Sequence, residues 1–414
     1  MSPTCFINRR LPSTLTPSQS ERTGLARSRR QVAPSAMASA APPKVPGTAL
    51  LELLQGQQLG SDQQGVKDSV KQYYTDLTSS KDLLTSACTT CKAPSPDVRA
   101  MLKDVPAEIV DRYYGCGTPL PMGITGLRVL DLGCGTGRDC YVAARMVGPN
   151  GFVTGVDMTP DQLAVARQYM EQYNTQVLGY PKPNMRFVQG HIEKLDGVED
   201  GSQDLIISNC VINLSPDKAA VLSEAWRVLA PGGEVYFSDI YCDRRLPAEV
   251  RTHPVLLGEC LGGALYTNDF LRLARQTGFM DPRSLESEEV IITDPALKDL
   301  VGNARFYSIT YRLFKLPGRL EDLCEEYGQV AVYKGTLPGH KHGYALDDHH
   351  FFVTNKPMLV CGNTAAMVEE TWLAPHFQVV GDRSVHYGAF DCGPSPAASG
   401  APAASKASAA GGCC

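Results

Sequence analysis

The chain has 414 residues, of which 43% are hydrophobic and 20% are charged, and its formal net charge is −5. A length of this order predicts two to three domains at about 150 residues each. The mildly acidic balance argues against a nucleic-acid partner, which favours a clustered basic surface. No apolar run is long enough to predict a membrane-spanning helix. We therefore expect a soluble globular protein that needs neither nucleic acid nor membrane.

The two ends of the chain differ from the rest in composition. Residues 1–46 are rich in Arg and Ser and poor in acids, which is typical of an organelle transit peptide. A disordered extension, or upstream sequence preceding a true start at Met37, is the alternative. We expect a plastid or cytoplasmic location accordingly. Residues 393–414 are mostly Ala, Ser, Gly and Pro and end in Cys413 and Cys414, which predicts a disordered tail.

Strand and helix patterns alternate from about residue 127. Strands are predicted at 128–133, 151–158, 184–190, 204–210 and 234–240, and helices at 159–173 and 215–229. This alternation predicts a mostly parallel sheet with helices on both faces. We therefore assign residues 66–242 to an α/β domain of the Rossmann-like type.

The pattern changes beyond residue 242. Residues 243–316 contain a Gly-rich stretch with a cysteine, a helix at 267–279 and an aromatic-rich strand at 306–316. They predict a cysteine-bearing insertion followed by the end of the sheet. Residues 317–392 hold weaker strand candidates and predict a small α+β domain.

A glycine loop, DLGCGTGRD (131–139), follows the first predicted strand and opens a helix. Gly133, Gly135 and Gly137 allow a tight turn and a close approach of the backbone to a ligand. Asp157 ends the next strand, where an acid can bond ribose hydroxyls. Asp131 would repel a pyrophosphate but suits a cationic amine. The loop therefore favours S-adenosylmethionine over a dinucleotide, and its wording resembles motif I of class I methyltransferases.

The chain has 14 cysteines and no secretory signal, so its thiols are better candidates for structural, ligating or catalytic roles than for disulfides. Cys210 ends a predicted strand just after Asn209, at the edge of the sheet where ligands gather. Its sulfur could be a methyl acceptor, a ligand for the acceptor, or a small core hydrophobe. Cys116 and Cys260 lie in Gly-rich stretches, a context typical of reactive or ligating thiols.

Other cysteines and histidines give weaker signals. Cys88 and Cys91 have CxxC spacing, but no second CxxC completes a zinc site. His349 and His350 are adjacent, which on a strand would point them to opposite faces, so a surface loop is expected there. Cys134 and Cys140 are expected in the core. Four further cysteines match no motif: Cys242, Cys324, Cys361 and Cys392.

Four stretches together, YYGCG (113–117), SNCVINLS (208–215), FSDIYCDRRLP (237–247) and GECLGGALY (258–266), are similar to arsenite S-adenosylmethionine methyltransferases of the microbial and algal type. The resemblance runs from about residue 66 to 390. It implies that three cysteines hold trivalent arsenic as thiolates: Cys116, Cys210 and Cys260. It also implies that Cys88 or Cys91 can form a disulfide with Cys116. Besides the three loop glycines, the residues expected to line the cofactor are Tyr114, Gly115, Asp131, Asp157, Met158, Ile192, Glu193 and Asn209.

The implied chemistry is consistent with these residue types. Thiolates are soft ligands that select soft centres, and three of them leave the arsenic lone pair free to attack the sulfonium methyl in line. No general base is needed. Each transfer oxidises arsenic, so we expect reduction by glutathione or thioredoxin. The expected substrates are arsenite, methylarsenite and their glutathione conjugates, the products are mono- and dimethylarsenicals, and the protein is expected to be a monomer.

Two other functions share part of this pattern. A methyltransferase of a small lipid or quinone carbon would need the glycine loop but not three thiols. A thiol-based metalloid-binding protein would need the cysteines but not the glycine loop.

Overall fold

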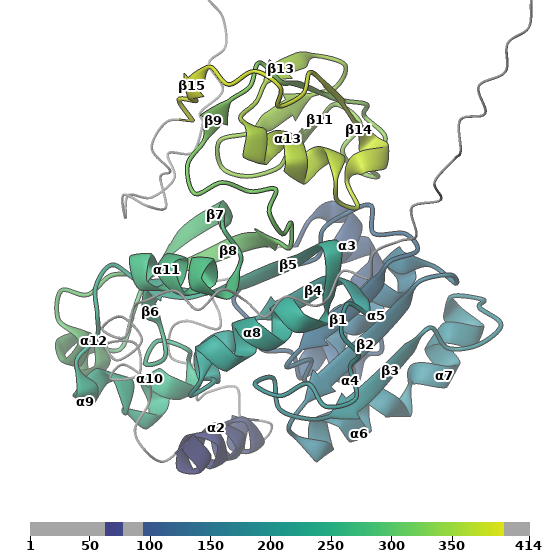
Figure 1. The fold of residues 1–414 in the computed structure, drawn as a ribbon. Helices are drawn as coiled ribbons and strands as arrows, with labels where there is room; N and C mark the ends of the chain where they lie inside the picture. The colour runs from purple at the N-terminus through teal and green to yellow at the C-terminus, as the bar shows by residue number, and fades with distance from the viewer. Residues whose placement is uncertain (1–62, 78–93, 393–414) are drawn as a thin grey trace, which may run out of the picture. The chain divides into compact units, whose positions relative to one another are not determined.

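The computed structural model describes residues 63–77 and 94–392 (Figure 1). The predicted transit peptide, the predicted tail, Cys88 and Cys91 lie outside these ranges. Within the described ranges, no helix is both long enough and apolar enough to cross a membrane.

The centre of the fold is one sheet in the order β3-β2-β1-β4-β5-β8-β7, with β6 paired to β5. Its strands are β1 (Arg128–Leu132), β2 (Phe152–Asp157), β3 (Met185–Gln189), β4 (Gln203–Asn209), β5 (Leu229–Cys242), β6 (Leu265–Tyr266), β7 (Arg283–Val290) and β8 (Phe306–Phe314). Strands β1 to β5 pair in parallel, whereas β8 and β7 are antiparallel additions. The predicted α/β class is confirmed.

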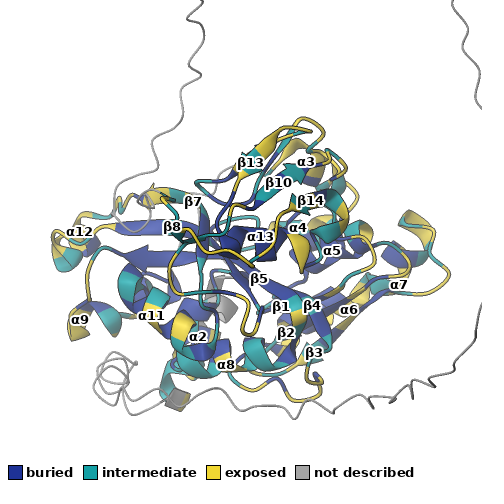
Figure 2. Cartoon of the chain, turned by 45° about the horizontal axis from the view of Figure 1, so that its top comes forward, coloured by how far each residue is buried: buried dark blue, intermediate teal, exposed yellow. Residues whose placement is uncertain are grey.

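Helices cover both faces of this sheet. They are α2 (Gln63–Leu77), α3 (Pro96–Leu102), α4 (Ala107–Asp111), α5 (Arg138–Val147), α6 (Pro160–Gln168), α7 (Met170–Gln172), η3 (Tyr173–Val177), η4 (Ile212–Leu214), α8 (Lys218–Val228), α9 (Ala248–Arg251), α10 (Pro254–Gly258), α11 (Thr267–Thr277) and α12 (Pro295–Val301). Alternate residues of a strand point to opposite faces. Leu130 accordingly joins the core under α8 and α11, and Val129 joins the core under α3, α5 and α6. Figure 2 shows the buried strands between these helices.

Three local expectations need correction. The predicted helix at 159–173 is divided into α6, α7 and the π-helical turn η3. Strand β5 begins at Leu229 and so includes residues 230–233, which the predicted helix at 215–229 and strand at 234–240 had left between them. Strand β7 was not predicted, because its residues Arg283–Val290 carry acids that face solvent at the edge of the sheet, as edge strands commonly do.

Residues 317–392 form further small sheets and a core of their own. The elements are β9 (Glu325–Glu326), β10 (Val330–Tyr333), β11 (Gly343–Ala345), β12 (Phe351–Val353), β13 (Pro357–Leu359), α13 (Gly362–Glu369), η5 (Ala374–His376), β14 (Phe377–Val380) and β15 (Gly388–Ala389). This content agrees with an α+β region, while the domain boundaries stay a prediction. Residues 346–350 form a loop as expected, but His350 is buried and its Nδ1 lies 2.8 Å from Oδ1 of Asp347, so the expected surface position was wrong for His350.

A fully buried ion pair of the main sheet makes hydrogen bonds to residues of this region. Arg312 of β8 donates two hydrogen bonds of 2.8 Å to Glu234 of β5. The same guanidinium donates to the hydroxyl of Tyr344 and to the carbonyl of Leu346, and the indole N–H of Trp372 donates to Glu234. Paired and hydrogen-bonded in this way, two buried charges can be tolerated.

Candidate active site

The glycine loop joins β1 to α5 with a backbone that other residues adopt only under strain. Gly133, Gly135 and Gly137 have φ angles of 69°, 54° and 87°. A Cβ on Gly133 would lie 2.4 Å from Val211, and one on Gly137 would lie 2.8 Å from Phe187. Glycine is therefore required by both the turn and the packing at Gly133 and Gly137, and by the turn alone at Gly135.

A cleft opens at the carboxyl ends of β1, β2 and β4, where ligands of parallel sheets bind. Every residue predicted to contact the cofactor, Gly137 excepted, lines it: Tyr114, Gly115, Asp131, Gly133, Gly135, Asp157, Met158, Ile192, Glu193 and Asn209. Gly137 instead precedes α5 as its N-cap. The arrangement brings the predicted residues together around one cavity.

The cleft contains two buried carboxyl groups. Burial, and after it the nearby Asp139, raise the pKa of Asp131 to about 8. Burial also raises the pKa of Asp157, against the lowering effect of the N–H groups of Thr159 and Gly135, which donate at 2.8 and 2.9 Å. A cation beside Asp131 would favour its ionised form. The site therefore fits a ligand that carries an ammonium group.

Asn209, at the end of β4, fixes the loop that carries Cys116. Its Oδ1 accepts hydrogen bonds from the N–H groups of Cys116 and Gly117, both at 3.1 Å. Its Nδ2 donates to the carbonyl of Gly117 at 2.8 Å and contacts the hydroxyl of Tyr113. Sequence reasoning gave Asn209 only a place beside the cofactor. The structure adds a second role, which couples the cleft to the cysteine loop.

The three predicted arsenic ligands lie in one buried cluster. Cys116 and Cys210 form a disulfide with a Cα–Cα distance of 5.8 Å. The Cys260 thiol donates to the carbonyl of Cys210 at 2.9 Å. The pairing of Cys116 with Cys88 or Cys91 stays a prediction, since both lie outside the described residues.

Two of these cysteines have strained backbones. Cys210 has a φ of 56° and Cys260 a φ of 64°. A non-glycine residue in this region costs on the order of 1–3 kcal/mol, and such residues cluster at functional sites. The strain therefore marks the positions of both sulfur atoms as functionally constrained.

Sequence reasoning missed Asp239, on β5 beside the cluster. An oxygen of its carboxylate lies within 4.8 Å of the sulfurs of Cys210 and Cys260. Burial raises its pKa to about 7. The sequence did contain a signal for Asp239, which is its position near the carboxyl end of a strand. Asp239 lies near that end of β5, as Asn209 lies at that end of β4.

Helix α2 also contributes to the cleft, which the sequence did not reveal. Lys67 and Val70 line the cavity, and Lys67 forms an ion pair of 3.3 Å with Glu193. On the opposite wall, the Arg138 guanidinium stacks 3.1 Å from the ring centroid of Tyr113. A cation over an aromatic ring holds both in place. Tyr113 is thereby positioned next to Asn209.

Parallel strands β1 to β5, the glycine loop and the acids at the carboxyl ends of β1 and β2 define a class I, S-adenosylmethionine-dependent methyltransferase. The methyltransferase-domain family matches residues 125–278. The chain is 53% identical over 330 residues to the arsenite methyltransferase of Aquipseudomonas alcaligenes, covering 79% of this chain and 94% of that relative. It is 41% identical over 321 residues to the arsenite methyltransferase of Mus musculus, covering 76% and 84% respectively.

A solved structure agrees with these relatives. The crystal structure of CrArsM, an arsenic(III) S-adenosylmethionine methyltransferase from Chlamydomonas reinhardtii, is 69% identical, with a TM-score of 0.71. The match covers 72% of this chain and all (100%) of that chain. The chain belongs to the arsenite methyltransferase family, as the four sequence stretches predicted. These relatives favour that interpretation over a lipid or quinone methyltransferase and over a metalloid-binding protein.

Proposed function

We propose that the chain transfers methyl groups from S-adenosylmethionine to trivalent arsenic held by Cys116, Cys210 and Cys260, giving mono- and dimethylarsenicals. The observation that carries the proposal is the position of Cys210. It lines the cleft of the glycine loop, and it is bonded to Cys116 and accepts a hydrogen bond from Cys260. One residue thus belongs to both the donor site and the thiol cluster.

The residues of the cleft fit the proposed methyl donor. Asp131, Asp157 and the loop backbone would hold its amine and ribose, since Asp139 and Asp157 add negative charge around Asp131 and a cation there would favour the ionised carboxylate. S-adenosylmethionine supplies, when bound, a sulfonium methyl group that the arsenic lone pair can displace in line. Three soft sulfurs suit trivalent arsenic and leave that lone pair exposed. Asn209 would hold Cys116 at the distance this requires.

Arsenic can bind all three sulfurs only after the Cys116–Cys210 disulfide is reduced. Two electrons from a dithiol open the bond and give two thiols. Conversely, each methyl transfer makes arsenic pentavalent, and two cysteine thiolates that close a disulfide return it to the trivalent state. We propose glutathione or thioredoxin as the reductant that reopens the bond.

The test uses purified protein with arsenite, S-adenosylmethionine and a thiol, and separates the arsenic species over time. Cys210→Ser and Cys260→Ser should abolish methylation while S-adenosylmethionine still binds by calorimetry. Cys242→Ser is the matched control, because Cys242 is a buried thiol of the same apolar cluster but is not a proposed ligand. Full methylation by Cys260→Ser would disprove the three-thiolate site.

We further propose that residues 1–46 direct the protein to a plastid and that the protein acts as a monomer. The Arg-rich, acid-poor composition of the leader supports the first statement. A fluorescent fusion with and without residues 1–46 tests it, and a cytoplasmic signal from both fusions would contradict it. Light scattering of the purified protein tests the second statement.

A further inference from the structure

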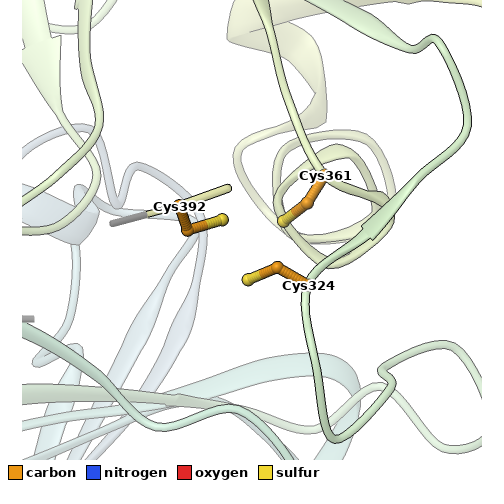
Figure 3. A group of neighbouring side chains, drawn as sticks. All are labelled: Cys324, Cys361 and Cys392. Carbon is orange, nitrogen blue, oxygen red and sulfur yellow. The ribbon is translucent and has the colours of Figure 1, made fainter. Parts of the chain in front are cut away.

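A second group of three cysteines lies in the C-terminal region. The sulfurs of Cys324, Cys361 and Cys392 all lie within 4.8 Å of one another, and Figure 3 shows them directed toward a common point. They are far apart in the sequence and match no motif there. Only the fold brings them together.

Two independent pieces of backbone position these thiols. Strands β9 and β15 pair antiparallel, with Glu326 opposite Gly388, and the pairing continues to Cys324, whose carbonyl accepts the N–H of Phe390 at 2.8 Å. Cys324 and Cys392 are thereby held on neighbouring segments. Cys361 comes from elsewhere, as the N-cap of the eight-residue helix α13.

The surroundings of Cys361 stabilise sulfur in a ligating form. The N–H of Thr364 donates to its Sγ at 3.5 Å, and Nη2 of Arg283 lies 3.9 Å away. Arg283 is buried and also pairs with Asp281 and Asp347. A helix N-terminus and a guanidinium both favour negative charge. Cys361 therefore lies in a place that favours a thiolate.

The cluster is also accessible. Cys361 is buried, but Cys324 and Cys392 are partly exposed. A small ligand can thus reach the three sulfurs from one side while the helix closes the other.

The number and type of donor atoms in the cluster indicate which ion it binds. No carboxylate or imidazole in residues 63–77 and 94–392 joins the three sulfurs. A structural zinc ion takes four ligands in a tetrahedron, whereas trivalent arsenic takes three sulfurs and keeps its lone pair. Soft thiolates select soft centres in either case. Three converging thiols with no fourth ligand among the described residues favour trivalent arsenic.

We propose that Cys324, Cys361 and Cys392 form a second, non-catalytic trithiolate site for trivalent arsenic. The proposal takes its ligand from the proposed function but does not depend on the catalytic cysteines. Binding is an exchange of ligands: arsenous acid and three thiols give the trithiolate and three waters. Three As–O and three S–H bonds break, three As–S and three O–H bonds form, and arsenic stays trivalent. The bound arsenic would join β9, β15 and α13 by covalent bonds.

The experiment uses the full chain in a background that lacks the other candidate thiols. In this background Cys116, Cys210, Cys260, Cys88, Cys91, Cys413 and Cys414 are all replaced by Ser. After incubation with arsenite and desalting, elemental analysis should find one arsenic per protein, and X-ray absorption should find three sulfur neighbours. No bound arsenic, or zinc bound in preference with four ligands, would overturn the proposal.

Two further variants show whether these thiols are responsible. Cys361→Ser in the same background should lose the arsenic, and it should fold, because serine is a favourable N-cap. Cys242→Ser in that background is the control and should keep it. Arsenic retained after all three of Cys324, Cys361 and Cys392 are replaced would disprove the site.

The two proposals fail separately. Cys324, Cys361 and Cys392 replaced together in the otherwise intact chain should lower bound arsenic from two equivalents to one and leave the rate of methylation at saturating arsenite unchanged. A loss of methylation in that variant would overturn the non-catalytic assignment. If the intact chain does not methylate arsenite but the serine background binds it, only the proposed function fails.

Discussion

Two cysteine clusters of the described residues each bring three sulfur atoms together, but they differ in backbone conformation and in surroundings. At the sheet edge, Cys210 and Cys260 have positive φ angles and lie beside a cleft. In the C-terminal region, Cys361 has an ordinary φ of −67° and caps a helix. A strained backbone persists only where the surrounding structure holds it in place, and such positions cluster at functional sites. A helix cap, in contrast, stabilises the fold. The difference supports the proposal that the first cluster, and not the second, takes part in methyl transfer.

The buried ion pair between Arg312 and Glu234 lies within the main sheet, and its hydrogen bonds to Tyr344, Leu346 and Trp372 connect the sheet to the C-terminal region. Its removal should have the largest effect. Arg312→Met leaves the Glu234 charge buried without its partner, which costs about 3–5 kcal/mol of unfolding free energy. Denaturant unfolding measures it. The control is Arg312→Met combined with Glu234→Gln, which should recover part of the loss. Equal stability of wild type and Arg312→Met would mean that the pair does not stabilise the fold.

Asn209→Ala tests whether the cleft and the first cluster are coupled. It removes the acceptor of the Cys116 and Gly117 N–H groups, and an unsatisfied buried donor costs about 1–3 kcal/mol. We expect methylation to fall about thirtyfold at the middle of that range, with a smaller change in S-adenosylmethionine affinity.

Asn209→Asp keeps an acceptor oxygen and is the matched control, so it should retain more activity than Asn209→Ala. If both variants lost affinity for S-adenosylmethionine and methylated bound arsenic at the normal rate, Asn209 would serve the cofactor alone.

The fold was predictable where the sequence repeats a simple pattern. Alternation and the glycine loop located β1 to β5 and the cleft, because burial of a parallel sheet demands long apolar strands. Asp239 follows the same rule for strand ends and could have been found. The cluster of Cys324, Cys361 and Cys392 could not, because its geometry depends on the pairing of two-residue strands. Strand β7 was hidden by its exposed acids.

The pH dependence of cofactor binding tests a feature of the cleft that residues 317–392 do not share, namely a carboxyl group with a raised pKa. The folded-state pKa of Asp131 is raised to about 8, so the carboxyl is mostly neutral at pH 7. A cationic ligand needs the carboxylate, and binding must therefore release a proton below that pKa. Affinity for S-adenosylmethionine should rise about fivefold from pH 7 to pH 8. Calorimetry in two buffers measures both affinity and proton release.

Asp131→Asn cannot ionise, so it should bind more weakly and with an affinity that varies little over the same range. A wild-type affinity that is flat between pH 7 and pH 8 would show that Asp131 is already ionised or does not meet the amine.

The smallest expected effect is on stability, and it compares the strained backbone at Cys260 with the unstrained backbone at Cys242. Cys260 has a φ of 64°, a region that costs a residue with a Cβ about 1–2 kcal/mol and glycine almost nothing. Cys260→Gly should therefore be more stable than Cys260→Ala by about 1 kcal/mol, although both lack the thiol. Cys242 lies in β5 and is absent from the residues with positive φ in the described chain. There the order should reverse, with Gly about 0.5–1 kcal/mol less stable than Ala. If the Ala variant were more stable than the Gly variant at both positions, the pocket of the first cluster would store no strain at Cys260. Packing alone would then place its sulfur.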